Sequence, residues 1–356
     1  MIGYLDISNY KSIKQLGLNC SRINVLIGEP NVGKSNILEA LDLSYLPSML
    51  LTNAVNQKAN KEQIDVKKYF RVNSASDLFN DGDISKSISI SHPNFSFSPK
   101  LNFKRENNSP GNSTEKKSYF EISFENGFTS FDKDFNPVEP VQFFRSPIAP
   151  YRFKENIDFH DTGNYIDRLM PLYGNNLLDV IKHNPDFREF IGGLINDFGL
   201  ELNIDSSSDT LFVQKKINPG IVYNMKYEAL ADTLRRVIFY IAAIRYNNKV
   251  VITFEEPDAH SFPKFVSLMA DEIIQNNKNQ FFIATHNPYL LNSLIENTPT
   301  GELSVFVCGF DKEKGTTANK LSDTDLSELL DYGVDIFFNI NRYLDDGVKH
   351  SSWVLC

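Results

Sequence analysis

The chain has 356 residues, 41% of them hydrophobic, which is enough for one large domain or for two to three lobes. A net charge of −9 argues against a surface covered by nucleic acid, although it leaves room for a local basic groove. The 3 cysteines are widely separated and lack CxxC spacing, which argues against a zinc site and indicates a reducing, cytoplasmic compartment. No apolar run approaches the roughly 18 residues of a membrane span, so no contact with a membrane is expected.

The amino-terminal part of the chain predicts two strands, at residues 4–10 and 23–27, and then a helix from Lys34 to about Tyr45 that Pro47 ends. Between the second strand and the helix lies GEPNVGKS, which matches the pattern G-x-x-x-x-G-K-[ST] in its required strand-to-helix context. Backbone N–H groups of such a turn cradle phosphates, Lys34 reaches their oxygens and Ser35 ligates Mg²⁺. Binding of ATP or GTP is therefore predicted at Gly28, Glu29, Pro30, Asn31, Val32, Gly33, Lys34, Ser35 and Asn36.

The central part of the chain predicts two insertions. From residue 49 to 150, short alternating stretches such as SISIS and SYFEISF are separated by Gly, Pro and Asn turns, which is typical of a small antiparallel β lobe. From residue 151 to 204 the pattern becomes helical and predicts a second, helical lobe.

The segment KVVITFEEPDAH predicts a buried parallel strand that ends at two carboxylates, Glu255 and Glu256. Ligands bind at this edge of a parallel sheet. Glu255 is therefore predicted to hold Mg²⁺ through water, and Glu256 to polarise an attacking water. Acidic residues after a strand also serve as loop solvation or helix caps, but the phosphate-binding pattern upstream favours the catalytic interpretation.

The remaining elements alternate. A helix is expected near 262–276, a strand at 280–286 that ends at His286, a helix from Pro288 and a strand at 303–310, so the fold class is α/β. A lone histidine at a strand end is more often structural than catalytic. The position of His286 one strand after the paired glutamates favours a neutral imidazole that bonds the γ-phosphate or the attacking water.

These segments resemble the ATP-binding-cassette (ABC) class, and within it the nucleic-acid-associated branch that contains SMC proteins, RecF and the OLD family. EEPDAH is similar to the OLD-type EEPEAH, and ATHNPYLL to TTHSP-LL of that group. The resemblance implies a P-loop NTPase of ABC-ATPase head type that hydrolyses ATP with Mg²⁺. It implies that Glu255 is the Walker B carboxylate, Glu256 the catalytic glutamate and His286 the switch histidine, and it places Asp258 and Ala259 in the D-loop region.

The resemblance covers about 1–48 and 210–310. It implies a discontinuous head, residues 1–48 and 205–320, into which the β lobe (49–150) and the helical lobe (151–204) are inserted. Gln142, after the β lobe, is the candidate Q-loop ligand of Mg²⁺. A helical tail is expected at 321–356, which either packs on the head or forms part of a dimer or effector surface.

One segment departs from the family pattern. Heads of this class enclose ATP in pairs, with a signature serine and glycine at a helix N-terminus of the second copy, so a homodimer or higher homo-oligomer is implied. The corresponding segment, EALADTLRRVIFYIAAI, has Ala231 where serine is usual and lacks the glycine. Asp232 or Thr233 is the candidate helix cap, and Arg235 or Arg236 either faces the nucleotide or only solvates the helix.

Several functions follow from this resemblance. No pattern of the Toprim nuclease domain of OLD proteins is present, so an ATPase without a nuclease is implied. The leading hypothesis is a nucleotide-gated switch in bacterial phage defence or a toxin-like cassette, working with a separately encoded effector protein. The alternative is a DNA repair or maintenance clamp of RecF or SMC type that binds DNA directly, although the basic stripes are modest and reduce to the pairs Lys67-Lys68 and Lys215-Lys216. A nucleotide-binding scaffold with negligible turnover also remains open.

Overall fold

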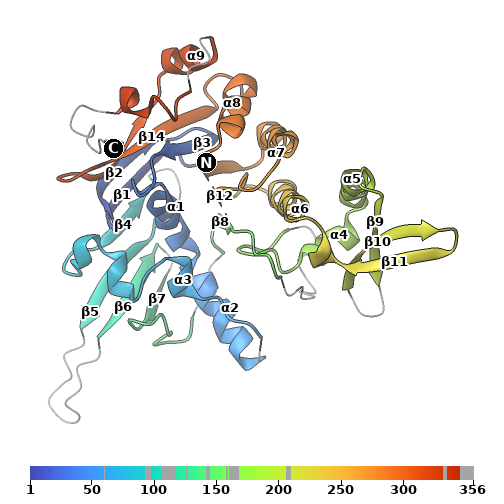
Figure 1. The fold of residues 1–356 in the computed structure, drawn as a ribbon. Coiled ribbons are helices and arrows are strands. Elements are labelled where there is room, and N and C mark those ends of the chain that lie inside the picture. Colours follow the sequence, from blue (N-terminus) through green and yellow to red (C-terminus); the bar gives the residue numbers. More distant parts are fainter. Residues whose placement is uncertain are drawn as a thin grey trace, which may run out of the picture.

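The structure is a computed structural model and describes residues 1–59, 61–92, 98–105, 118–125, 127–141, 145–157, 159, 168–205, 210–331 and 335–344. Over these ranges the chain forms a 12-stranded mixed sheet with helices on both faces, and a separate 3-stranded antiparallel sheet (Figure 1). The α/β fold class predicted from the sequence is therefore confirmed.

The centre of the large sheet is parallel. Its strands lie side by side in the order β14 (Leu303–Asp311), β3 (Ile23–Gly28), β13 (Gln280–Ala284), β12 (Val251–Glu255) and β8 (Ile148–Tyr151). All 6 residues of β3 are buried, because both faces of a central parallel strand are covered. The carboxyl ends of β3, β13, β12 and β8 consequently meet at one edge of the sheet.

Antiparallel strands extend the sheet beyond β14. They follow in the order β15 (Gly315–Lys320), β2 (Ile13–Asn19), β1 (Tyr4–Tyr10), β4 (Ile88–Ser91), β5 (Lys100–Arg105), β6 (Ser118–Phe124) and β7 (Gly127–Phe131). The predicted β-rich insertion supplies β4 to β7, and these strands join the sheet through the pairing of β4 with β1. The sequence did not predict β2 or β15, which connect the parallel and antiparallel parts.

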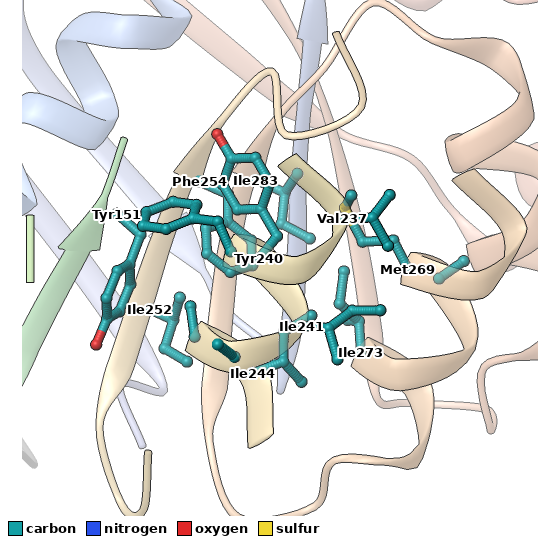
Figure 2. Close-up of a cluster of buried hydrophobic side chains, with 14 of the residues drawn as sticks. Tyr151, Val237, Tyr240, Ile241, Ile244, Ile252, Phe254, Met269, Ile273 and Ile283 are labelled. Atoms are coloured by element: carbon teal, nitrogen blue, oxygen red, sulfur yellow. The ribbon is translucent and has the colours of Figure 1, made fainter. Parts of the chain in front are cut away.

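Helices cover the parallel strands on both faces. On one face, α1 (Lys34–Asp42) and α2 (Leu46–Lys58) pack against a core that includes Leu26. On the other, α6 (Asp232–Arg245), α7 (Pro263–Gln275) and α8 (Pro288–Asn297) pack against Val25 and Ile27. Figure 2 shows part of this second core, where side chains of α6 and α7 meet those of β12. Successive residues of β3 thus serve two cores, as the two-residue period of a strand requires.

The first helix ends earlier than the sequence predicts. α1 stops at Asp42, a 3₁₀ turn follows at Leu43–Tyr45, and Pro47 lies in the first turn of α2. The prediction that Pro47 ends the helix is therefore wrong. Proline is tolerated in a first turn because its missing N–H has no helical partner there, so it marks a helix start as readily as a helix end.

The region between β8 and α6 contains helices and strands. After α4 (Leu177–His183) and α5 (Pro185–Asn196), the strands β9 (Leu200–Asp205), β10 (Thr210–Asn218) and β11 (Ile221–Lys226) form the 3-stranded sheet. This sheet was not predicted, and Figure 1 shows it beside α5, at the far side of the molecule from β5. A further short helix, α3 (Val66–Tyr69), follows α2. The domain boundaries given above stay predictions.

The described part of the tail packs against the head. α9 (Asp323–Asp331) begins after Ser322, whose hydroxyl accepts a hydrogen bond from the N–H of Asp325. Leu329, Ile336 and Ile340 are buried in the same core as α6 to α8. Residues 340–343 form a 3₁₀ turn, and Phe338 is 90% exposed. Leu330 is also exposed, at 37%, whereas Leu326, Phe337, Tyr343 and Leu344 are partly buried against that core, so most of the large apolar side chains in the described part of the tail stabilise the head. In the described part of the chain, no helix is long and apolar enough to cross a bilayer.

A pair of tail variants tests this packing. Ile336→Ala is expected to lower the free energy of unfolding by about 2–5 kcal/mol, because it leaves a cavity at a side chain that is only 3% exposed. Phe338→Ala, two residues away, is expected to change it by less than about 0.5 kcal/mol. Urea denaturation of both variants measures the difference. Equal effects would show that the tail does not pack as described.

Candidate functional site

The phosphate-binding pattern forms a tight turn between β3 and α1. A Cβ atom at Gly28 would lie 2.5 Å from the backbone oxygen of Cys308 on β14, so no side chain fits there. Gly33 has φ 100 and precedes α1, and a Cβ on it would lie 2.1 Å from Oγ1 of Thr316 on β15. Asn31 adopts a left-handed conformation with φ 64. The turn therefore brings backbone N–H groups close together at the N-terminus of α1, which favours an anion.

Lys34 lies across this turn. Its side chain is buried, and its Nζ donates hydrogen bonds of 2.8 Å to the carbonyl oxygens of Gly28 and Glu29. Burial lowers the pKa of Lys34, while the carboxylates of Glu256 and Glu255 partly oppose that shift. The ammonium group is thus held at the mouth of the turn by two acceptors that a phosphate can replace.

Asn36 is tied to the neighbouring strands. Its Nδ2 donates to Oγ of Ser12 at 2.7 Å, and that oxygen lies 2.6 Å from Oγ1 of Thr316. The structure therefore gives Asn36 a supporting contact behind the turn. Of the other predicted nucleotide-binding residues, Pro30, Asn31, Gly33, Lys34 and Ser35 line the cavity with Asn36, whereas Gly28, Glu29 and Val32 belong to the same turn but do not line it.

The paired glutamates follow β12 directly. Glu255 and Ser35 line the same cavity, and the Ser35 hydroxyl is close enough to favour the ionised carboxylate, so the two predicted Mg²⁺ ligands lie near each other. Burial tends to raise the pKa of Glu255, but the charges of Arg152 and Arg71 and the hydroxyl of Ser35 outweigh it and hold the pKa below its usual value. This carboxylate is ionised at neutral pH and available to a cation.

Glu256 and His286 face each other across the edge of the sheet. Glu256 adopts a left-handed conformation with φ 45, and its N–H donates to the carbonyl oxygen of Ala284 at 2.8 Å. Its Oε1 lies 3.6 Å from Nε2 of His286. Burial and the charge of Lys34 lower the pKa of His286, against the opposing charge of Glu256, so the imidazole is neutral at pH 7.

Asp258, predicted to lie in the D-loop region, is part of the framework of the site. It is buried, and its Oδ1 accepts a hydrogen bond of 2.8 Å from Oγ1 of Thr285, the residue before His286. Burial raises the pKa of Asp258. This contact joins the segments that follow β12 and β13, which carry Glu256 and His286.

Two arginines that the sequence did not single out also lie at the site. Arg152 follows β8, and its guanidinium pairs with Asp42 at 2.9 Å and with Glu255 at 3.5 Å. Asp42 is fully buried, and burial raises its pKa to about 6 against the charge of Arg152. Arg71, after α3, pairs with Glu255 at 3.1 Å and also with Glu39 on α1.

The signature segment places one of its two arginines at the site. α6 begins after Ala231, which provides no side-chain cap, and Asp232 pairs with Arg236 at 2.6 Å. Arg236 lines the cavity, whereas the guanidinium of Arg235 donates to the carbonyl oxygens of Leu230 and Glu155. Gln142, the predicted Q-loop residue, lies outside the described residues.

These groups surround one cavity of about 740 Å³, within the size range of small-molecule sites. Besides the phosphate-binding turn, its lining includes Arg71, Arg152, Phe153, Arg236, Tyr240, Glu255, Glu256, Ala259, His260, Ala284 and His286. Among the described residues, no group of three or more His, Cys, Asp or Glu side chains is placed to hold a metal ion by itself. Ser35 and Glu255 fit a hard cation that takes its remaining ligands from water and phosphate, as Mg²⁺ does.

The missed arginines had unequal signals in the sequence. Arg152 directly follows the apolar stretch IAPY, so its place at the end of a strand was readable from the pattern. Arg71 lies 184 residues from Glu255, and no local pattern indicates that contact.

Comparison with known proteins gives a family match. The model of a family described as "AAA domain, putative AbiEii toxin, Type IV TA system" matches residues 23–292, which is more than half of the chain. No curated protein matches.

Three solved structures of SMC heads are also similar. An SMC head bound to the C-terminal winged-helix domain of ScpA is 15% identical with a TM-score of 0.46, covering 91% of this chain and 98% of that chain. The SMC head domain from Thermotoga maritima is 14% identical with a TM-score of 0.41, covering 90% and 98%. An Smc head domain with an extended coiled coil, bound to the C-terminal domain of ScpA derived from Pyrococcus furiosus, is 13% identical with a TM-score of 0.44, covering 93% and 98%.

Proposed function

This chain belongs to the AAA-domain family whose model it matches, and from that premise we propose that it is a Mg²⁺-dependent ATPase that works as a nucleotide-gated switch. One observation carries the proposal: Lys34 and Ser35 from α1, Glu255 and Glu256 from the end of β12, and His286 from the segment after β13 line a single cavity. Each has the chemistry that one part of phosphoryl transfer to water needs.

The roles of the residues follow from their positions. The turn and Lys34 would bind the phosphates, and Ser35 with Glu255 would hold Mg²⁺, which would neutralise charge on the phosphate oxygens. Glu256 is exposed to solvent within the cavity and accepts the proton of the attacking water. The neutral imidazole of His286 hydrogen-bonds the reacting phosphate or that water. Arg152, anchored by the buried Asp42, orients Glu255.

Phosphate release tests this proposal directly. The purified chain with ATP and Mg²⁺ is expected to release phosphate continuously, and removal of Mg²⁺ by EDTA is expected to stop it. GTP in place of ATP tests the choice of base. Binding of ATP without any turnover would favour a nucleotide-binding scaffold instead.

Substitution of His286 separates turnover from binding. His286→Ala is expected to lower turnover about 100-fold with little change in ATP affinity, because the contact to the reacting group is lost. His183→Ala on α4, whose Nδ1 bonds the carbonyl oxygen of Asp179, is the control. A loss of affinity without a loss of turnover would make His286 a structural residue.

The pH dependence follows from the same side chain. Because the pKa of His286 is lowered from its usual value, the imidazole is neutral at and above about pH 6.5. Turnover is therefore expected to stay level above that pH and to fall at lower pH, where the imidazole becomes protonated. In His286→Ala, this particular decline should disappear.

We further propose that two copies close around ATP and that this change acts on a separately encoded effector, in a phage-defence or toxin-like cassette. Ala231 is exposed at the N-terminus of α6. In the closed dimer, this helix end of one copy would face the nucleotide bound to the other copy. Light scattering of Glu256→Gln with ATP is expected to give twice the mass of the nucleotide-free chain. Host cells that carry the gene cluster are expected to lose protection from phage when Lys34 is replaced.

Charge pairing favours an effector over DNA as the partner. Lys67 pairs with Asp134 at 2.5 Å and Lys216 with Glu201 at 2.6 Å, so each predicted basic pair is partly neutralised within the chain. Tight DNA binding that weakens steeply with salt would favour the DNA clamp instead.

A further inference from the structure

The cavity contains an arginine that joins two carboxylates from different elements. Nη1 of Arg71 lies 3.1 Å from Oε1 of Glu255, and Nη2 bonds Glu39 on α1. Arg71 itself has φ 50, in the left-handed region, and its side chain is 49% exposed. A planar guanidinium reaches both acceptors at once because its N–H groups are arranged as a rigid fork.

The two carboxylates differ in what else they bind. Glu39 is buried, forms an ion pair with Lys11 and accepts a hydrogen bond of 3.3 Å from the hydroxyl of Tyr10. It therefore keeps two partners if Arg71 moves away. Glu255 also faces Ser35 and Arg152. It is the predicted Mg²⁺ ligand, and in the structure one of its oxygens is occupied by Arg71.

Arg71 is the more exposed of the two arginines that pair with Glu255. Arg152 is only 15% exposed in its side chain and is held by Asp42 and by the carbonyl oxygens of Tyr151 and Thr253. Arg71 has solvent on one side. A divalent cation on the same carboxylate repels a guanidinium 3 Å away, so the two compete.

We propose that Arg71 competes with Mg²⁺ for Glu255, and that arrival of the metal with the nucleotide releases Arg71 from Glu255 while it keeps Glu39. The inference rests on the proposed binding of ATP and Mg²⁺. Residue 71 lies in the turn between α3 and the helical turn at Ala75–Leu78. The exchange therefore links metal loading to the position of that turn, next to Lys11 at the end of β1.

Two substitutions separate the bonds that Arg71 makes. Arg71→Lys keeps a positive charge for Glu39 but cannot reach both carboxylates, and Arg71→Ala removes both bonds. Lys67→Ala is the matched control, because Lys67 lies in the same segment but pairs with Asp134 on the surface. Thermal melting checks that each variant is folded, and Arg71→Lys retains the pair with Glu39 if Arg71→Ala is unstable.

The readout is binding, not turnover. Calorimetry measures the affinity for the non-hydrolysable analogue AMP-PNP over a range of Mg²⁺ concentrations at constant ionic strength. The Mg²⁺ concentration at half-maximal binding is expected to fall about fivefold in Arg71→Lys and Arg71→Ala, the factor that corresponds to one partly exposed ion pair, and to stay unchanged in Lys67→Ala.

The outcomes distinguish the inference from the function on which it rests. The same Mg²⁺ requirement in all four proteins would overturn the competition but leave ATP binding intact. A higher requirement in Arg71→Lys would also overturn it, since Arg71 would then assist the metal. No binding of AMP-PNP by any of them would overturn both the proposed function and the inference.

Discussion

Lys34→Ala is expected to weaken ATP binding by about 100-fold or more. Nζ of Lys34 makes two hydrogen bonds to the phosphate-binding turn, and phosphate oxygens take their place when nucleotide binds. Charge-assisted bonds of this kind contribute roughly 1.5–3 kcal/mol each, so the loss of two corresponds to at least two powers of ten in affinity. Calorimetry with ATP and Mg²⁺ measures the change.

A second lysine serves as the control for that experiment. Lys14 on β2 also donates to a backbone oxygen, that of Glu313, but at an exposed position outside the cavity. Lys14→Ala is expected to bind ATP as the parent does. If Lys34→Ala retained the parent's affinity, the assignment of the turn to phosphate binding would fail.

Glu256→Gln is expected to lower turnover by about 10²–10⁴-fold and to leave ATP affinity nearly unchanged. The amide has the size of the carboxylate but cannot accept the proton of the attacking water. Glu256 is 54% exposed in its side chain, so the substitution removes no buried ion pair. Phosphate release and nucleotide binding, measured on the same preparation, separate the two effects.

Glu201→Gln provides the comparison, because Glu201 also pairs with a cation, Lys216, but lies on the 3-stranded sheet. Its turnover should match the parent's. Parent-like hydrolysis by Glu256→Gln would mean that another group accepts the proton.

The central strands β3, β12 and β13 were predictable because each is a short apolar run that leads into residues with evident chemistry, whereas β8, at the edge of the parallel part, was not predicted. β3 and β12 were found in this way, and the family match confirms the predicted P-loop ATPase class. β15, with the sequence GTTANK, was missed because its only buried residues are Gly315 and Thr316, which form no apolar pattern. It is held as a strand by pairing with β14.

The candidate site was predictable to a similar degree. Glu255, Glu256 and His286 end adjacent strands, and the topology of a parallel sheet brings such positions together. The contacts of Arg71 depend on how a distant turn packs over α1, which no period or motif encodes. Asp42 on α1 shows the same limit, since its partners are Thr253 on β12 and Arg152 after β8.

The contacts behind Gly33 also bear on when the protein becomes able to bind nucleotide as it is synthesised. Ser12 and Thr316, which are 304 positions apart, meet directly behind the phosphate-binding turn, and Asn36 bonds to Ser12. Contacts of such long sequence separation form late, because the intervening chain must first be ordered. The ribosome must therefore pass residue 316 before the turn can gain its final support from Thr316.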